Sequence, residues 1–219
     1  MLVESPIPLT QTQIVAIRHG ETQWNALGRQ QGHADNPLNE LGERQSQALA
    51  ARLQHVPFAA LYSSDLQRAA QTGRAIAALS GHEIQLEPRL RERDLGVFEG
   101  YTKAEVKEKL PEVFAGYASG DIDYVIPEGE STRQRFERSM AVLHEIAARH
   151  AGQTVVVVTH GGVLNGLLRA CLHIPLDTKR DFAVFNASFN LFWFEAARWK
   201  LATWGDISHL DGIGSKDDP

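Results

Sequence analysis

The sequence has little that would support a secreted, membrane-bound or nucleic-acid-binding protein. Its 219 residues contain one cysteine, Cys171, so no intrachain disulfide can form, and a reducing compartment is expected. Apolar runs are far shorter than the roughly 20 residues that a membrane-spanning helix needs, and residues 1–13 lack a signal-peptide pattern. The formal net charge of −5 argues against general affinity for nucleic acid or anionic membranes. We therefore expect a cytoplasmic protein with neither class of partner.

Metal-binding patterns and repeats are also missing. Most histidines have no carboxylate or cysteine at the spacing of metal ligands; these are His33, His55, His82, His144, His150, His173 and His209. We therefore expect neither a metal nor another cofactor. The single biased segment is residues 212–219, which we expect to be a flexible tail.

What is present is a regular alternation of short apolar segments with amphipathic ones. Strands are predicted at residues 13–17, 59–63, 83–87 and 154–159, and helical periodicity follows most of them. The last of these strands is continuous and β-branched, which is typical of a central parallel strand. The pattern predicts one domain over residues 1–219, folded as a three-layer α/β/α sandwich with a mostly parallel sheet. Two late strands, at 187–195 and 199–203, are predicted to form an edge hairpin.

Residues 101–129 interrupt this alternation with two short helical pieces, broken by Pro111 and Gly120. We interpret them as a small helical insertion that caps the active site. Elsewhere, Ser64 and Gln67 have the spacing of a capping box, which predicts a helix that begins after Ser64. Arg68 would then lie in the opening turn of that helix.

Polar groups suited to chemistry follow three of the predicted strands. Arg18 and His19 follow the first strand, Arg68 lies one turn beyond the second, and His160 follows the strand at 154–159. The carboxyl ends of parallel strands share one edge of the sheet, where helix N-termini also point. Guanidinium groups match phosphate oxygens, so the sequence predicts a phosphate site at this edge.

These residue types also suggest a mechanism. A neutral imidazole can attack phosphorus through one ring nitrogen while a backbone carbonyl holds the other nitrogen protonated. The arginines and the second histidine would stabilise charge on the phosphoryl oxygens. The leaving oxygen needs a proton, so a carboxylic acid must lie near it.

Five segments of the chain form a further ordered pattern. They are Arg18 to Asn25 (Arg-His-Gly-Glu-Thr-Gln-Trp-Asn), Ser63 to Ala69, Leu90 to Gly100, Pro127 to Ser131, and Thr159 to Gly162. In this order they resemble the motifs of the histidine phosphatase superfamily, which includes the cofactor-dependent phosphoglycerate mutases. The resemblance covers nearly the whole chain.

The resemblance implies a role for each matching residue. His19 would be the nucleophile that becomes phosphohistidine, and Glu92 would be the proton donor. Phosphate-pocket roles fall to Arg18, Arg68 and His160, and substrate contacts to Thr22, Asn25, Gln31, Gly32 and Gly161. Glu92 lies in a run of charged residues, so Glu21 and Glu99 are alternative candidates for the proton donor. Asn25 has the alternative role of stabilising the turn that follows His19.

The resemblance leaves a choice between phosphatase and mutase. Asp94-Leu95 stands where the mutases have His-Tyr, and residues 101–129 lack the paired arginines with which mutases hold a second phosphate and the carboxylate. Residues 204–210 resemble the tails of the bacterial small-molecule phosphatase branch. We therefore expect a metal-independent phosphatase. The alternatives are a 2,3-bisphosphoglycerate-dependent phosphoglycerate mutase and, less favoured, a catalytically inactive regulatory module on the same fold.

The expected partner is a small phosphorylated metabolite that the sequence does not identify. Specificity is expected to lie in residues 101–129 and in the loop at 25–39, and neither contains a decisive motif. Candidates are phosphoserine, sugar phosphates, phosphoglycerate derivatives and α-ribazole phosphate. The aromatic late strands also offer an edge on which a homodimer can pair.

Overall fold

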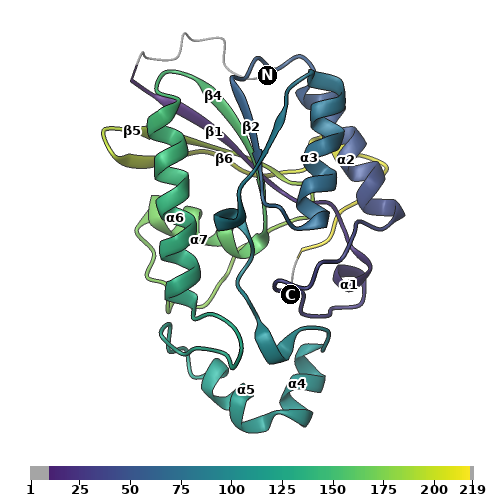
Figure 1. Ribbon diagram of the computed structural model, residues 1–219, viewed down its shortest axis with the longest axis vertical. Coiled ribbons are helices and arrows are strands. Elements are labelled where there is room, and N and C mark those ends of the chain that lie inside the picture. Colours follow the sequence, from purple (N-terminus) through teal and green to yellow (C-terminus); the bar gives the residue numbers. More distant parts are fainter. Residues whose placement is uncertain (1–9, 218–219) are drawn as a thin grey trace.

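The computed structural model describes residues 10–217, which form a three-layer α/β/α sandwich (Figure 1). One six-stranded sheet has the order β3-β2-β4-β1-β5-β6. Its strands are β1 (Thr12–Arg18), β2 (Ala60–Ser63), β3 (Ile84–Leu86), β4 (Thr154–Thr159), β5 (Phe189–Glu195) and β6 (Arg198–Asp206). The first four are parallel, whereas β5 and β6 run antiparallel at one edge. The predicted fold class and the late hairpin are therefore confirmed.

The alternation of side chains along each strand divides the core into two halves. Ile14 and Ala16 of β1 face α6 (Thr132–Arg149) and α7 (Gly161–Leu172), while Val15 and Ile17 face α2 (Glu40–Leu53) and α3 (Gln67–Ser80). The four valines of β4 are fully buried because helices cover both faces of the sheet. Burial of each such side chain stabilises the fold by about 1.5–3 kcal/mol.

Two helices of the sandwich begin at a side-chain cap, and a third lacks the cap that the sequence predicted. Asn39 caps α2 and accepts the Gly42 N–H at 2.8 Å, and Ser131 caps α6 through a capping box with Gln134. The capping box at Ser64 was a wrong prediction, because α3 begins at Gln67 after an uncapped Leu66. The Ser64 N–H donates to the carbonyl of Val158, which extends the pairing of β2 with β4 and turns the Ser64 side chain toward the end of β4.

The insertion contains α4 (Lys103–Lys109) and α5 (Pro111–Ala118), which lie beyond the carboxyl edge of the sheet (Figure 1). Phe98, Val106 and Ile126 form its own small apolar cluster. Arg29 ties the insertion to the body of the protein, since its Nη1 donates to the carbonyl of Gly100 at 2.5 Å and pairs with Glu105 at 2.9 Å. The two predicted helices are thus present.

The remaining helical elements are short. They are α1 (Gln23–Ala26) and the 3₁₀ turns Pro88–Leu90, Gly96–Phe98 and Ser208–Leu210. Within residues 10–217, no helix combines the length and apolar character needed to cross a membrane.

Residues 212–217 of the predicted flexible tail form hydrogen bonds with the loop that precedes β5. The Ser215 hydroxyl donates to the carbonyl of Asn186 at 2.7 Å, and the Asn186 N–H donates to the carbonyl of Lys216. The carboxylate of Asp217 accepts the Val184 N–H at 2.6 Å. These backbone partners fix the segment beside the loop that precedes β5. Residues 218–219 of the predicted tail lie outside the described residues, as do residues 1–9 of the segment that lacks a signal-peptide pattern.

Candidate active site

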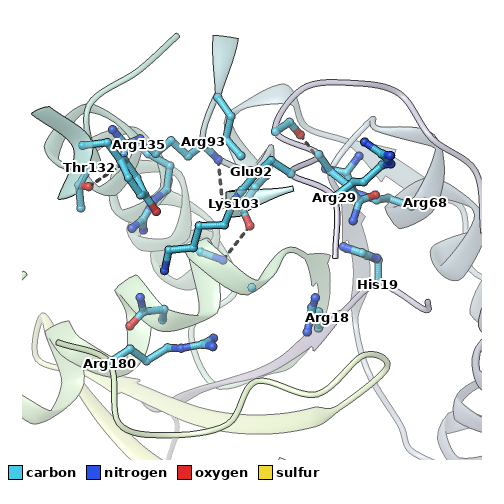
Figure 2. A pocket seen from close by; sticks show the side chains of 18 of the residues that line it. Arg18, His19, Arg29, Arg68, Glu92, Arg93, Lys103, Thr132, Arg135 and Arg180 are labelled. Atoms are coloured by element: carbon cyan, nitrogen blue, oxygen red, sulfur yellow. Dashed lines mark hydrogen bonds between the residues drawn. The ribbon is translucent and has the colours of Figure 1, made fainter. Parts of the chain in front are cut away.

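Three predicted site segments meet at the carboxyl edge of the sheet. β4 lies between β1 and β2, and the register pairs Arg18 with Thr159 and Ser63 with Val158. His19 and His160 therefore leave neighbouring strands, and their ring centroids are 5.1 Å apart. Figure 2 shows Arg18, His19 and Arg68 together at one end of a cavity of about 360 Å³.

The geometry of His19 suits a nucleophile. Its Nδ1 lies 2.7 Å from the carbonyl oxygen of Gly20, which can only accept, so Nδ1 carries the hydrogen and Nε2 keeps its lone pair. Burial, and then the charges of Arg68 and Arg18, hold the pKa of His19 well below its usual value. The imidazole is therefore neutral at neutral pH.

His160 is fully buried beside His19, behind the residues that form the cavity wall. Its Nε2 lies 2.8 Å from the hydroxyl of Ser64, and its Nδ1 has no hydrogen-bond partner among the described residues. Burial and the charge of Arg68 lower the pKa of His160 well below the ordinary value. Ser64 thus orients His160, a role that sequence reasoning missed because it assigned the Ser64 hydroxyl to a helix cap.

The two arginines at this end both donate to backbone carbonyl oxygens. Arg68 donates to the carbonyls of Ala34 at 2.9 Å and Gly32 at 2.7 Å, and Arg18 donates to the carbonyl of Val184. Burial lowers the pKa of Arg68 to about 10, so this group is still charged at pH 7. Because Arg68 donates to neutral carbonyl oxygens, it contributes a positive charge to this end of the cavity, which favours an anion.

Glu92 is the one carboxylate among the residues that line the cavity. Its Oε1 accepts the Arg93 N–H and its Oε2 the Gly162 N–H, both at 2.8 Å. A Cβ on Gly162 would lie 2.1 Å from Glu92 Oε1, so a side chain at this position would displace the Glu92 carboxylate. The rival acids lie elsewhere: Glu99 accepts the N–H of His33, and Glu21 accepts from the side chain of Asn39.

The other predicted contact residues divide into two groups. Gln31, Gly32 and Gly161 line the cavity, whereas Thr22 and Asn25 do not. Thr22 and Asn25 instead form the capping box of α1, and the Thr22 hydroxyl donates to Gln31 Oε1 at 2.9 Å. The structure thus places Asn25 in its alternative role of stabilising the turn that follows His19, with Thr22 as its hydrogen-bond partner there.

The opposite end of the cavity contains residues that sequence reasoning did not select. They come from α4, α6, α7, the loop before β5 and the loop between the first two 3₁₀ turns, and include Arg93, Lys103, Thr132, Arg135, Asn165 and Arg180. Figure 2 labels all of these except Asn165. Residues 101–129 contain no arginine, and most of the cations at this end come from outside the insertion. In the sequence, Arg135 is one polar position of an amphipathic helix, and no local motif identifies it as a site residue.

Within the described residues, no group of three or more histidine, cysteine, aspartate or glutamate side chains could hold a metal ion. The cations that line the cavity are arginine and lysine side chains. The donors that face the cavity are suited to a phosphoryl group and to nucleophilic attack by a neutral imidazole.

Comparison with known proteins agrees with this geometry. A family model for the histidine phosphatase superfamily (branch 1) matches residues 14–207. A metal-independent phosphoserine phosphatase of Arabidopsis thaliana is 41% identical over 207 residues, which cover 93% of this chain and 85% of that protein. Phosphoglycerate mutase-like protein 4 of the same plant is 38% identical over 206 residues, covering 92% of this chain and 88% of that protein.

Solved structures give the same picture. YhfR of Bacillus stearothermophilus superposes with a TM-score of 0.83 at 33% identity, covering 91% of this chain and 99% of that chain. A mycobacterial glucosyl-3-phosphoglycerate phosphatase in complex with VO3 superposes with a TM-score of 0.77 at 30% identity, covering 88% of this chain and 98% of that chain.

Proposed function

This chain belongs to the histidine phosphatase superfamily, and we propose that it hydrolyses phosphomonoesters of small cytoplasmic metabolites through a phosphohistidine at His19. The chain is a phosphoric monoester hydrolase. One observation carries the assignment of the nucleophile: Nδ1 of His19 is held by the carbonyl of Gly20, which leaves a neutral Nε2 beside two guanidinium groups.

In the first step, the Nε2 lone pair of His19 attacks phosphorus and the bond from phosphorus to the ester oxygen breaks. The protonated carboxyl group of Glu92 gives its proton to the departing oxygen, so the product leaves as a neutral alcohol. Arg18 and Arg68 stabilise the charge on the phosphoryl oxygens, and their fixed positions mean that little reorganisation is needed.

In the second step, a water molecule attacks the phosphohistidine from the side that the alcohol has left. The carboxylate of Glu92 takes a proton from this water, and the bond between phosphorus and Nε2 breaks. Inorganic phosphate leaves and His19 returns to its neutral form. Glu92 lies between the nucleophile end and the opposite end of the cavity, as both roles require (Figure 2).

The remaining alternative among enzymes is a phosphoglycerate mutase, since relatives of both kinds are similar to this chain. Incubation with 3-phosphoglycerate separates the two activities. We expect release of inorganic phosphate, measured colorimetrically, without rapid formation of 2-phosphoglycerate in an enolase-coupled assay. Rapid formation of 2-phosphoglycerate without free phosphate would establish the mutase instead.

The same reaction tests the nucleophile and the third alternative, an inactive regulatory module. An alkaline quench during turnover should trap a phosphorylated peptide that contains His19, because phosphohistidine is more stable in alkali than in acid. His19→Ala should abolish both the phosphopeptide and the release of phosphate, and a chelator should leave wild-type turnover unchanged. An unphosphorylated His19 peptide during active turnover would contradict the mechanism.

A further inference from the structure

Arg135, on the inner side of α6, is a buried cation without a protein partner. The residue is 4% exposed, it lines the cavity, and neither its Nε nor its Nη1 has a hydrogen-bond partner among the described residues. Burial lowers its pKa to about 10, so the guanidinium is still charged at pH 7. A buried charge without a partner destabilises a fold, and its presence at a cavity wall points to a ligand that supplies the missing anion.

In contrast to Arg135, the neighbouring Arg93 has protein acceptors for its guanidinium donors. Its Nε donates to the carbonyl of Glu130 at 2.8 Å, its Nη1 to the hydroxyl of Thr132 at 2.9 Å, and its Nη2 to the carbonyl of Tyr124 at 3.2 Å. Arg93 therefore ties the insertion to the start of α6. The guanidinium donors of Arg135 do not link two segments of the protein in this way.

The protein backbone leaves room for the Arg135 side chain. A Cβ on Gly166 of α7 would come within 2.5 Å of Arg135 Nη1, so the guanidinium lies close to the α7 backbone. The charge of Glu92 raises the pKa of Arg135, but both Glu92 oxygens already accept backbone N–H groups. Glu92 thus lies near Arg135 without forming a hydrogen bond with it.

A second cation reaches the same space from the insertion. Lys103, the first residue of α4, is exposed, lines the cavity, and has no hydrogen bond or ion pair within the described part of the chain. Figure 2 shows Arg135 and Thr132 at one end, His19 and Arg18 at the other, and Lys103 and Glu92 between them.

From this geometry we propose that Arg135, assisted by Lys103, binds a second anionic group of the substrate. The substrates would then be small phosphomonoesters that carry a carboxylate or a second phosphate. The inference rests on the proposed phosphatase activity and names the class of molecule on which that activity acts.

The balance of charge around the cavity supports this substrate class. Among the described residues that line the cavity are one carboxylate, Glu92, and eight cations: Arg18, Arg29, Arg68, Arg93, Lys103, Arg135, Arg169 and Arg180. Arg29 and Arg180 pair with acids outside the lining, Glu105 and Asp217. A substrate with a single phosphoryl group leaves Arg135 unpaired, whereas a second anion supplies its partner.

A matched pair of substrates tests the proposal. Glycerol 3-phosphate differs from 3-phosphoglycerate in having a hydroxymethyl group where the latter has a carboxylate. A charged hydrogen bond contributes about a ten- to hundredfold preference, so the wild type should favour 3-phosphoglycerate by about this factor in kcat/KM. Arg135→Met should reduce that ratio toward one, and Lys103→Gln should reduce it partly.

Ratios measured on one preparation do not depend on the folded fraction, so partial misfolding of a variant cannot mimic the result. Arg133→Gln is the matched control. Arg133 lies on the same helix but is paired with Asp123 at the surface, outside the cavity, and its replacement should leave the ratio unchanged. A parallel comparison of fructose 1,6-bisphosphate with fructose 6-phosphate shows whether the second anion is a phosphate or a carboxylate.

The outcomes separate this inference from the proposed function. A wild-type ratio near one for both substrate pairs, or ratios that Arg135→Met leaves unchanged, overturns the second-anion subsite while the phosphatase activity stands. Failure of the wild type to hydrolyse any of the four substrates, with no phosphopeptide at His19, overturns the proposed function itself.

Discussion

The two ends of the cavity are both rich in cations, but they are built differently. At the phosphoryl end, defined by Arg18, His19, Arg68 and His160, each side chain is held by a protein group: a carbonyl for the first three and the Ser64 hydroxyl for His160. At the distal end, Arg135 and Lys103 have no such partner in the described chain. The phosphoryl end is thus positioned by protein groups before substrate arrives, whereas in our proposal the substrate supplies the partner of Arg135 at the distal end.

Glu92 lies between the two ends, and its replacement gives the largest expected change after the loss of His19 itself. Glu92→Gln removes the proton that the leaving oxygen needs, so kcat on glycerol 3-phosphate should fall by about 10²–10⁴-fold. p-Nitrophenyl phosphate has a good leaving group and needs no such proton, so its hydrolysis should fall much less. Steady-state kinetics with both substrates on one preparation measure the difference.

An equal loss on both substrates would show that another group donates the proton. Glu99 would then be the next acid to test, although its Oε1 is used by the N–H of His33 at 2.6 Å. The comparison between the ends would also change, because Glu92 would then belong to the scaffold between them.

The two ends also differ in how far the sequence predicts them. His19 and His160 directly follow strands and Arg68 lies near the start of a helix, so the rule that parallel strands share a carboxyl edge brought them together before any coordinates were known. The sandwich and its edge hairpin followed from the same alternation of strands and helices.

The distal end could not be predicted in this way. Arg135 lies in the second turn of α6, and Lys103 begins a helix of the insertion. Their proximity depends on how the insertion packs over the sheet, through contacts such as Arg29 with Glu105, and no local pattern encodes that packing. The role of Ser64 and the docking of residues 212–217 were missed for the same reason, since their partners are distant in the sequence.

A smaller effect is expected in the pH dependence of stability, and it should come from the phosphoryl end. His19 and His160 have folded pKa values well below 6.5, and burial lowers that of His209 to about 4. Below pH 6.5 these histidines are protonated in the unfolded chain but remain neutral in the folded chain. The free energy of unfolding therefore falls as pH falls. Above pH 6.5 this contribution to stability is fully present.

Chemical denaturation between pH 7 and pH 5 measures this slope. Each buried histidine contributes up to about 1.4 kcal/mol per pH unit. His160→Asn should therefore reduce the dependence of the free energy of unfolding on pH by the contribution of one proton. Replacement of the exposed His55 by Asn should leave that dependence unchanged. An unchanged slope in His160→Asn would mean that His160 is protonated in the folded protein, contrary to the neutral phosphoryl end described here.

The smallest expected effect is on the stability of the free protein, and it contrasts the two ends most directly. Arg68→Met removes the donors of two buried carbonyl acceptors, Gly32 and Ala34, and should lower the free energy of unfolding by about 1–3 kcal/mol. Arg135→Met removes a buried charge that has no protein partner, so it should raise that energy by about 1 kcal/mol. Thermal denaturation in phosphate-free buffer would show the latter as an increase in Tm of about 2–4 °C.

Addition of 3-phosphoglycerate should make the wild type more stable than Arg135→Met, because the ligand stabilises the wild type through Arg135 and stabilises the variant less. If Arg135→Met instead lowers Tm as much as Arg68→Met does, the Arg135 guanidinium supports the fold. The distal end would then be complete without substrate, as the phosphoryl end is. A rise in Tm together with a lost preference for 3-phosphoglycerate would show that this buried charge is maintained for binding at the expense of stability.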